Sequence, residues 1–146
     1  MLKVAVLVSG GGTNLQALLD SEARGENPHG KISLVVASKP GVYALERAKN
    51  AGVPGVVVRR KDYATAEEFD KALLGVLKEN GIDVVVYDIN PANMQKFVDM
   101  GASSAATVKE LAAQVDVCIT CVPMPKDAKG VLLGPDGVFE NLPEGG

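Results

Sequence analysis

Short apolar runs alternate along the chain with longer segments in which apolar residues recur at helical spacing. A short apolar run is typical of a strand that is buried in a sheet. The run at residues 103–106 is the weakest, and the run at residues 115–122 is strong. The pattern predicts six strands, at residues 3–8, 32–37, 55–58, 82–87, 103–106 and 115–122.

The segments between these runs predict helices, and several of them begin with a capping signal. Thr65 and Glu68 have the spacing of a capping box. Asn90 is a favourable N-cap, and Pro91 follows it at the first helical position. The predicted helices lie at residues 14–24, 42–51, 65–79, 91–100, 107–114 and 126–133, and a "GPDG" turn precedes a last segment at 138–142.

Strands that alternate with helices predict a parallel sheet with helices on both faces. We therefore expect a single α/β domain over residues 1–146, with a doubly wound, Rossmann-like sheet of about six strands. The simplest strand order for such a sheet is 3-2-1-4-5-6. The sequence shows no linker, internal repeat or low-complexity segment.

Composition and charge narrow the class of protein further. Hydrophobic residues make up 47% and charged residues 23% of the chain, as in soluble globular proteins. The net charge of −3 argues against a basic surface for nucleic acid. No apolar run approaches the roughly 18 residues that span a bilayer. The apolar N-terminus lacks a signal-peptide cleavage site, and only two cysteines are present, so we expect a cytoplasmic protein.

The stretch "SGGGTNLQALL" joins the first predicted strand to the first helix and contains the first candidate site. In this fold, ligands bind beyond the carboxyl ends of the strands, where the strand order reverses. Glycines let the backbone approach a ligand closely, and the next helix presents free N–H groups and a positive dipole end. The candidate phosphate-binding residues are therefore Gly10, Gly11, Gly12, Thr13 and Asn14.

Two known phosphate-binding motifs differ from this loop. A Walker loop has Lys and then Ser or Thr after its last glycine, and neither follows here. The dinucleotide fingerprint G-x-G-x-x-G fits Gly10 and Gly12 but meets Leu15 at its third position, and the second strand is followed by Lys39 where an acid is expected. The loop therefore favours a phosphate monoester over NAD. The alternative is a tight turn that binds nothing.

The first half of the chain resembles the phosphoribosylglycinamide formyltransferase family of purine synthesis. The stretches that carry the resemblance are "KVAVLVSGGGTNLQALLD", "ISLVVASKPGVYALERAKNAGVP" and "EEFDKALLGVLKENGIDVVV". The resemblance covers residues 1–86, and it implies that Gly12, Thr13 and Asn14 hold the phosphate of glycinamide ribonucleotide. The Asn, His and Asp that are catalytic in that family, after its fourth strand, have no counterpart here.

Residues 84–146 resemble a different family, the NAD-binding domain of 3-hydroxyisobutyrate dehydrogenase and related β-hydroxyacid dehydrogenases. The stretches "VVVYDINP" and "VDVCITCVP" carry this resemblance. It implies that Asp88, beside Asn90, binds the adenosine ribose and that Val122 and Pro123 contact the cofactor. The alternative is that Asp88 is an ordinary acid at a strand end beside a helix cap. Because the first strand, glycine fingerprint and catalytic Lys of that family are missing, we expect no cofactor, with NAD as the alternative.

The two resemblances meet within one predicted strand, so the chain has a formyltransferase-like half at 1–86 and a dehydrogenase-like half at 87–146. Each half lacks residues that make its parent an enzyme. We therefore interpret the chain as an engineered chimera, a scaffold without a complete active site but with residual phosphate or ribonucleotide binding at the glycine loop. The alternatives are a glycinamide ribonucleotide formyltransferase-like enzyme and an NAD-binding module.

Three other side chains could carry chemistry. Cys118 and Cys121 form a C-x-x-C pattern, but they lie within a predicted strand rather than at a helix N-terminus. Two thiols alone cannot complete a zinc site, so we expect no metal and two buried structural cysteines. The single histidine, His29, falls in a loop and is expected to be solvated.

The last predicted strand bears on partners, because its apolar residues 115–122 lack the neighbouring strand that the dehydrogenase family provides. We expect a monomer, or a homodimer formed through this sheet edge. The expected ligand is a phosphate or a ribonucleotide, and neither nucleic acid nor a membrane is expected as a partner.

Overall fold

The computed structural model describes residues 1–144, and the chain divides into two compact units. Unit 1 spans Met1–Ile82 and unit 2 spans Asp83–Gly146. The division lies close to the boundary between residues 86 and 87 that the two resemblances predict. The expectation that both halves form a single domain stays a prediction.

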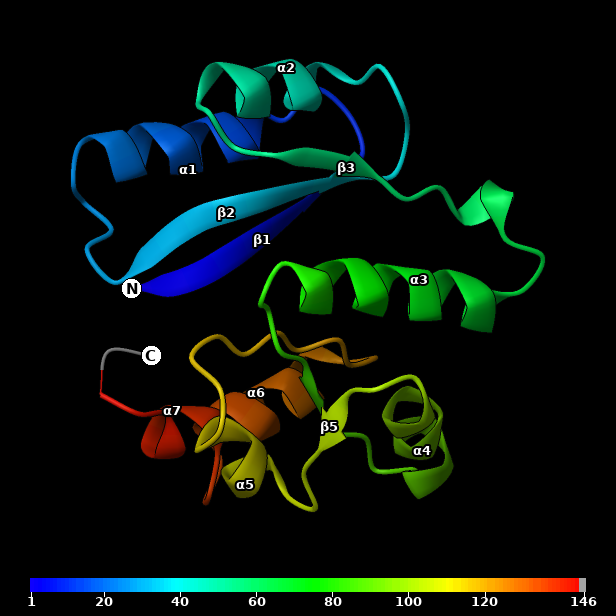
Figure 1. Cartoon of the computed structure of the whole chain (residues 1–146). Helices are drawn as coiled ribbons and strands as arrows, with labels where there is room; N and C mark the ends of the chain where they lie inside the picture. The colour runs from blue at the N-terminus through cyan, green and yellow to red at the C-terminus, as the bar shows by residue number, and fades with distance from the viewer. Residues whose placement is uncertain (145–146) are drawn as a thin grey trace. The chain divides into compact units, whose positions relative to one another are not determined.

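Unit 1 alternates strands and helices in the order that the sequence predicts (Figure 1). Its strands are parallel, and β2 lies between β1 and β3. The elements are β1 (Leu2–Val8), α1 (Thr13–Ala23), β2 (Gly30–Ala37), α2 (Tyr43–Asn50), β3 (Gly55–Val57), the 3₁₀ helix η1 (Arg60–Asp62) and α3 (Ala66–Glu79). The order β3-β2-β1 confirms the first half of the predicted strand order.

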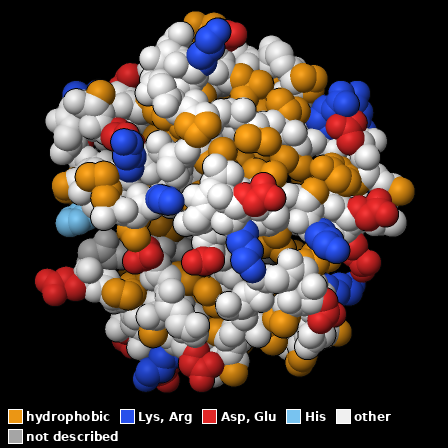
Figure 2. All heavy atoms as spheres, viewed as in Figure 1, with side chains coloured by type: hydrophobic (Ala, Val, Ile, Leu, Met, Phe, Trp, Pro, Cys, Tyr) orange, Lys and Arg blue, Asp and Glu red, His pale blue; other side chains and the backbone are white. Residues whose placement is uncertain are grey.

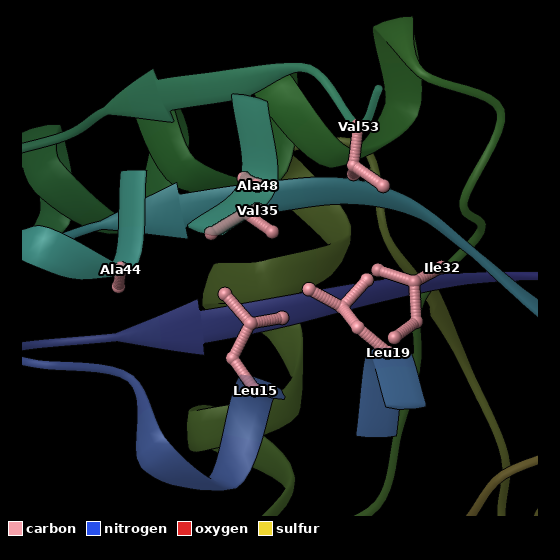
Figure 3. Close-up of a cluster of buried hydrophobic side chains, with 7 residues drawn as sticks. All are labelled: Leu15, Leu19, Ile32, Val35, Ala44, Ala48 and Val53. Carbon is pink, nitrogen blue, oxygen red and sulfur yellow. The ribbon is translucent and has the colours of Figure 1, made fainter. Parts of the chain in front are cut away.

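Helices α1 and α2 cover one face of this sheet, and a compact aliphatic cluster fills the space between them and the strands (Figure 1). Leu15 and Leu19 contribute from α1 and are 1% and 7% exposed. Leu18, which has the spacing of the same apolar face, is 47% exposed, because the sheet contacts only a narrow stripe of this helix. Figure 3 shows the members of the cluster: Leu15, Leu19, Ile32, Val35, Ala44, Ala48 and Val53.

The opposite face of the sheet is covered by α3 (Figure 1). Successive residues of a strand point to opposite faces, so Leu34 and Val36 of β2 enter this second cluster while Val35 enters the first. Burial on both faces explains why β2 reads as a nearly continuous apolar run. The α3 side chains that pack here are Phe69, Ala72, Leu73, Val76 and Leu77.

The start of α3 confirms the capping box that the sequence predicts. The Thr65 hydroxyl accepts a hydrogen bond from the backbone N–H of Glu68 at 3.1 Å, and the Glu68 carboxylate accepts one from the N–H of Thr65 at 3.3 Å. Two N–H groups that the first turn would otherwise leave without a partner are thereby satisfied.

Unit 2 contains short elements, and the two strands among its described residues pair with each other. β4 and β5 run parallel and pair over two residues each. Asn90 caps the helix that follows it, as predicted, and Thr107 caps the next helix. The elements are β4 (Val85–Val86), α4 (Pro91–Asp99), β5 (Ser103–Ser104), α5 (Val108–Ala112), α6 (Pro125–Leu133) and α7 (Val138–Asn141).

Parallel strands connected by helices confirm an α/β, Rossmann-like fold, but two details of the predicted sheet are wrong. Residues 1–144 contain five strands in two separate sheets, β1-β2-β3 and β4-β5, rather than one sheet of six. Residues 115–122 form no strand, and within this segment Val117 and Ile119 are 62% and 87% exposed. An apolar run forms a strand only when a neighbouring strand pairs with its backbone N–H and C=O groups. The strands of unit 2 are only two residues long, which is too short to pair with residues 115–122 over their length.

The distribution of charged side chains on the surface is consistent with the net charge of −3. On the face that Figure 2 shows, acidic and basic side chains are scattered among apolar ones. Among residues 1–144, no helix combines the length and the hydropathy that crossing a bilayer requires.

Replacing the capping hydroxyl of α3 should destabilise unit 1. Thr65→Ala removes the acceptor for the Glu68 N–H and is expected to lower the free energy of unfolding by about 1 kcal/mol. Urea denaturation followed by circular dichroism measures this change. Thr65→Ser keeps the hydroxyl and is the matched control. An equal loss in both variants would show that the hydroxyl does not cap the helix.

The exposed apolar segment at 115–122 should promote self-association, because its side chains and backbone groups are available to another chain. Ile119→Lys is expected to reduce the concentration-dependent increase in mass that sedimentation velocity measures. Ile89 is 91% exposed and lies outside the segment, so Ile89→Lys is the matched control. A monomer at every concentration, or an equal effect of both variants, would contradict this role of the segment.

Candidate functional site

The predicted phosphate-binding residues form the connection between β1 and α1, at the carboxyl end of β1. The carbonyl of Val8, the last residue of β1, accepts a hydrogen bond from the N–H of Ser38 at 2.9 Å, which continues the pairing with β2 to this edge. Helix α1 begins at Thr13. Gly10, Gly11 and Gly12 therefore connect the first strand to the first helix, as predicted. The expectation that the strand order reverses beside them is wrong for the described residues, because β1 lies at the edge of its sheet and pairs only with β2.

Gly12 is the N-cap of α1 and adopts the left-handed conformation, with φ 72° and ψ 37°. A Cβ at this position would lie 2.6 Å from the Cβ and 2.9 Å from the Cα of Ala44 in α2. Both the backbone conformation and this contact exclude a side chain, so glycine is required here. Gly10 and Gly11 differ, because a Cβ at either would meet no atom within 4 Å.

Helix α2 binds the carbonyl groups of the glycine loop. The N–H of Ala44 donates to the carbonyl of Gly10 at 3.4 Å, and the Arg47 Nε donates to the carbonyl of Gly11 at 2.8 Å. All described peptide bonds are trans, and in a trans peptide the C=O and the N–H point in opposite directions. The N–H groups of Gly11 and Gly12 therefore point away from α2. Successive N–H groups directed to one side form an anion-binding concavity.

The first turn of α1 extends this set of donors. The carbonyl of Gly12 accepts the first helical hydrogen bond, from the N–H of Gln16 at 2.9 Å, and no side chain caps the helix. The first turn contains no acidic residue, so the helix itself places no carboxylate at the positive end of its dipole. Thr13 and Asn14 are exposed and add a hydroxyl and an amide beside these N–H groups. The arrangement has the donor chemistry to bind an oxyanion.

The predicted ribose-binding acid, Asp88, lies after β4 and is bound to the start of α4. Its Oδ1 accepts from the N–H of Asn90 at 2.7 Å, and its Oδ2 accepts from the Nδ2 of Asn93 at 3.1 Å. The bond from the Asn90 N–H, followed by that from Asn93, lowers the pKa of Asp88. The Asn90 side chain in turn accepts from the N–H of Ala92 at 3.0 Å. These bonds are those of a helix cap, and the ribose-binding role of Asp88 stays a prediction.

The other predicted residues of unit 2 lie in the irregular segment before α6. Val122 and Pro123 are exposed, and their role in cofactor binding stays a prediction. The two cysteines are free, and the expectation that both are buried is wrong: Cys118 is half-buried and Cys121 is exposed, because this segment is not a strand within a sheet. Burial raises the pKa of the Cys118 thiol, which disfavours a reactive thiolate. His29 is exposed in its loop, as predicted.

The structure therefore places the candidate residues in two groups. Residues 10–14 form one continuous loop and helix start in unit 1, while Asp88, Asn90, Val122 and Pro123 belong to unit 2. Within residues 1–144, the His, Cys, Asp and Glu side chains form no group of three or more that could hold a metal ion.

The sequence reading missed Arg47, which contacts the loop from α2. The sequence holds one indication of this contact. Arg47 follows Ala44 by three residues, so the two side chains share the helix face that packs beside the glycine turn. Its long polar side chain next to two inward-facing alanines was compatible with a solvated surface position as well.

Two family models match this chain. A family model described as "Formyl transferase" matches residues 2–89, and one described as "NAD binding domain of 6-phosphogluconate dehydrogenase" matches residues 71–146. The chain belongs to the formyl transferase family through its first part and to this NAD-binding family through its second. Both models match residues 71–89, the interval that contains the division between the two compact units.

Relatives of the first part are purine-biosynthesis proteins. The chain is 46% identical over 83 residues to the trifunctional purine biosynthetic protein adenosine-3 of Homo sapiens, which covers 57% of this chain and 8% of that protein. It is 41% identical over 86 residues to the phosphoribosylglycinamide formyltransferase of Haemophilus influenzae, covering 59% of this chain and 40% of that protein. The chain thus spans less than half the length of these relatives.

Solved structures agree with these relatives. Glycinamide ribonucleotide transformylase 1 from Symbiobacterium toebii is 39% identical with a TM-score of 0.54, over 57% of this chain and 39% of that one. The transformylase 1 from Geobacillus kaustophilus is 33% identical with a TM-score of 0.55, over 68% of this chain and 55% of that one. The two-part resemblance that the sequence indicates is confirmed.

Adding a methyl group at Gly12 should destabilise the loop, whereas adding one at Gly10 should not. Gly12→Ala places a Cβ against Ala44 and requires a left-handed alanine, which together are expected to cost about 1–3 kcal/mol of unfolding free energy. Gly10→Ala meets open space and should change stability by less than about 0.5 kcal/mol. Chemical denaturation measures both. Equal stability of the two variants would contradict the close contact between Gly12 and α2.

Proposed function

We propose that this protein is an engineered chimera of two Rossmann-like fragments that binds a phosphate monoester at residues 10–14 and has no complete active site. The observation that carries the binding function is the set of N–H groups of Gly11, Gly12 and the first turn of α1, which the loop directs away from α2. Such a set binds phosphate oxygens without a lysine or a metal.

The substrate class follows from the part of the chain that contains the loop. The loop lies within the segment that matches the formyl transferase family, and the names of the similar structures include glycinamide ribonucleotide. A ribonucleotide with a single terminal phosphate fits a loop that has neither the Walker lysine nor the third glycine of the dinucleotide fingerprint. We propose glycinamide ribonucleotide as the ligand that binds best.

The proposal of an engineered origin rests on the way the two families meet. Two different family models each match more than half of the chain, and they overlap over residues 71–89, from the middle of α3 to just beyond β4. A junction inside a shared helix and strand keeps the local hydrophobic pattern of both parents. Recombination of fragments at such a point is a design strategy that preserves local sequence–structure agreement.

The absence of catalysis is proposed from the residues that follow β4. The resemblance to the formyltransferase family places its catalytic Asn, His and Asp after this strand, and the sequence there is of the dehydrogenase type. The single histidine lies before β2, exposed in a loop of unit 1. General acid–base transfer of a formyl group to an amine needs such a group within reach of the reacting atoms.

One specific observation favours a second function, that of an NAD-binding module. The NAD-binding family model matches residues 71–146, and it includes Asp88, which follows β4, as the ribose-binding acid of such a domain follows a strand. The two functions differ in the ligand that they predict.

A thermal melting series distinguishes these functions. Glycinamide ribonucleotide and inorganic phosphate should stabilise the protein and NAD should not, and a ligand at a hundred times its Kd adds about 2.7 kcal/mol. Stabilisation by NAD that Asp88→Asn abolishes would identify the NAD-binding module instead. Incubation with glycinamide ribonucleotide and a formyl-folate donor is expected to yield no formylated product, and product formation would overturn the non-catalytic assignment.

A further inference from the structure

Arg47 connects three parts of unit 1 around the glycine loop. Its guanidinium donates from Nε to the carbonyl of Gly11 at 2.8 Å and from Nη1 to the Oε1 of Gln16 at 2.9 Å. Its Cζ lies 4.7 Å from the centre of the Tyr43 ring, one turn earlier on α2. One side chain thus joins α2 to the loop and to the first turns of α1.

The bond to Gly11 determines the direction of one donor of the proposed site. Because the Gly11–Gly12 peptide is trans, holding its carbonyl toward Arg47 turns the Gly12 N–H to the opposite side. That N–H immediately precedes the first turn of α1 and is directed outward together with the N–H of Gly11.

Packing restrains this peptide on one side only. Gly12 lies against Ala44, whereas a Cβ placed at Gly10 or Gly11 would meet nothing within 4 Å. Glycine residues without such contacts explore a wide range of φ and ψ. The hydrogen bonds from α2 are the restraints on the two carbonyls, and the bond from Arg47 is the shorter, charge-assisted one.

The geometry requires an arginine rather than any cation. Nε and Nη1 belong to one rigid, planar group, and they reach Gly11 and Gln16 at the same time. The Tyr43 ring lies against that plane and limits its rotation. A lysine at this position keeps the charge but offers a single ammonium on a flexible chain, so it cannot hold both acceptors in this arrangement.

We propose that Arg47 is a positioning residue of the phosphate-monoester site, which fixes the Gly11–Gly12 peptide so that the Gly12 N–H faces the ligand. This inference rests on the proposed function, because it assigns the role of Arg47 at the same loop. The phosphate affinity of the glycine loop then depends on Arg47, a residue of α2 that lies outside the loop.

The test uses the full chain labelled with ¹⁵N and titrated with inorganic phosphate. The amide shifts of Gly11, Gly12 and Thr13 report binding. Arg47→Ala is expected to raise the Kd about tenfold, the size of a lost charge-assisted hydrogen bond. Lys49→Ala is the matched control, because it removes the same charge from the same helix at an exposed residue without a contact to the loop, and it should change the Kd less than about twofold.

Arg47→Lys separates positioning from charge. It keeps the net charge of the protein, and its Kd is expected to stay close to that of Arg47→Ala. Amide relaxation of the free protein gives a readout that does not depend on binding. The Gly12 order parameter should fall from about 0.85 to below about 0.6 in Arg47→Ala and Arg47→Lys, and it should not change in Lys49→Ala.

The outcomes separate the two proposals. If wild-type amides of residues 11–13 do not respond to phosphate, the proposed function is wrong, and the Gly12 order parameters still decide whether Arg47 fixes the loop. If wild type binds and Arg47→Lys binds equally well, or if Arg47→Ala behaves like Lys49→Ala, the positioning role of Arg47 is overturned.

Discussion

The close contact between the start of α1 and α2 is the constraint on which the site depends. Gly12 approaches Ala44 so closely that a Cβ at Gly12 would have no room. That approach brings the backbone N–H of Ala44 and the side chain of Arg47 within reach of the loop carbonyls. The same two helices share one apolar cluster with the sheet, so core packing and donor geometry are consequences of one arrangement.

The two parts of the chain differ in how well their strands are supported. In unit 1, β2 has a parallel neighbour on each side and helices on both faces, and the predicted order of its strands is confirmed. In unit 2, β4 and β5 have only each other, and the apolar segment at 115–122 pairs with neither. Strands depend on neighbours that are distant in sequence, and among the described residues no strand pairs with residues 115–122.

This dependence explains what the sequence could predict. Signals that act within a few residues were reliable: the Thr65–Glu68 capping box and the Asn90 cap both form as their spacing indicates. The prediction of a strand at 115–122 was wrong because an apolar pattern indicates burial, but the neighbouring strand that would pair with this segment is not part of the pattern. The role of Arg47 was out of reach for a related reason, since its two acceptors lie 36 and 31 residues away in the chain.

The tie between Arg47 and Gly11 also defines what must be moved if this loop is to be used elsewhere. A designer who transplants only "SGGGTN" onto another strand and helix would transfer the glycines without the groups that orient them. The portable piece extends from β1 through α2, about the first 50 residues, because the last of its hydrogen-bond donors comes from the second helix. The structural unit that holds the loop in this conformation is therefore a β-α-β-α unit rather than a sequence motif.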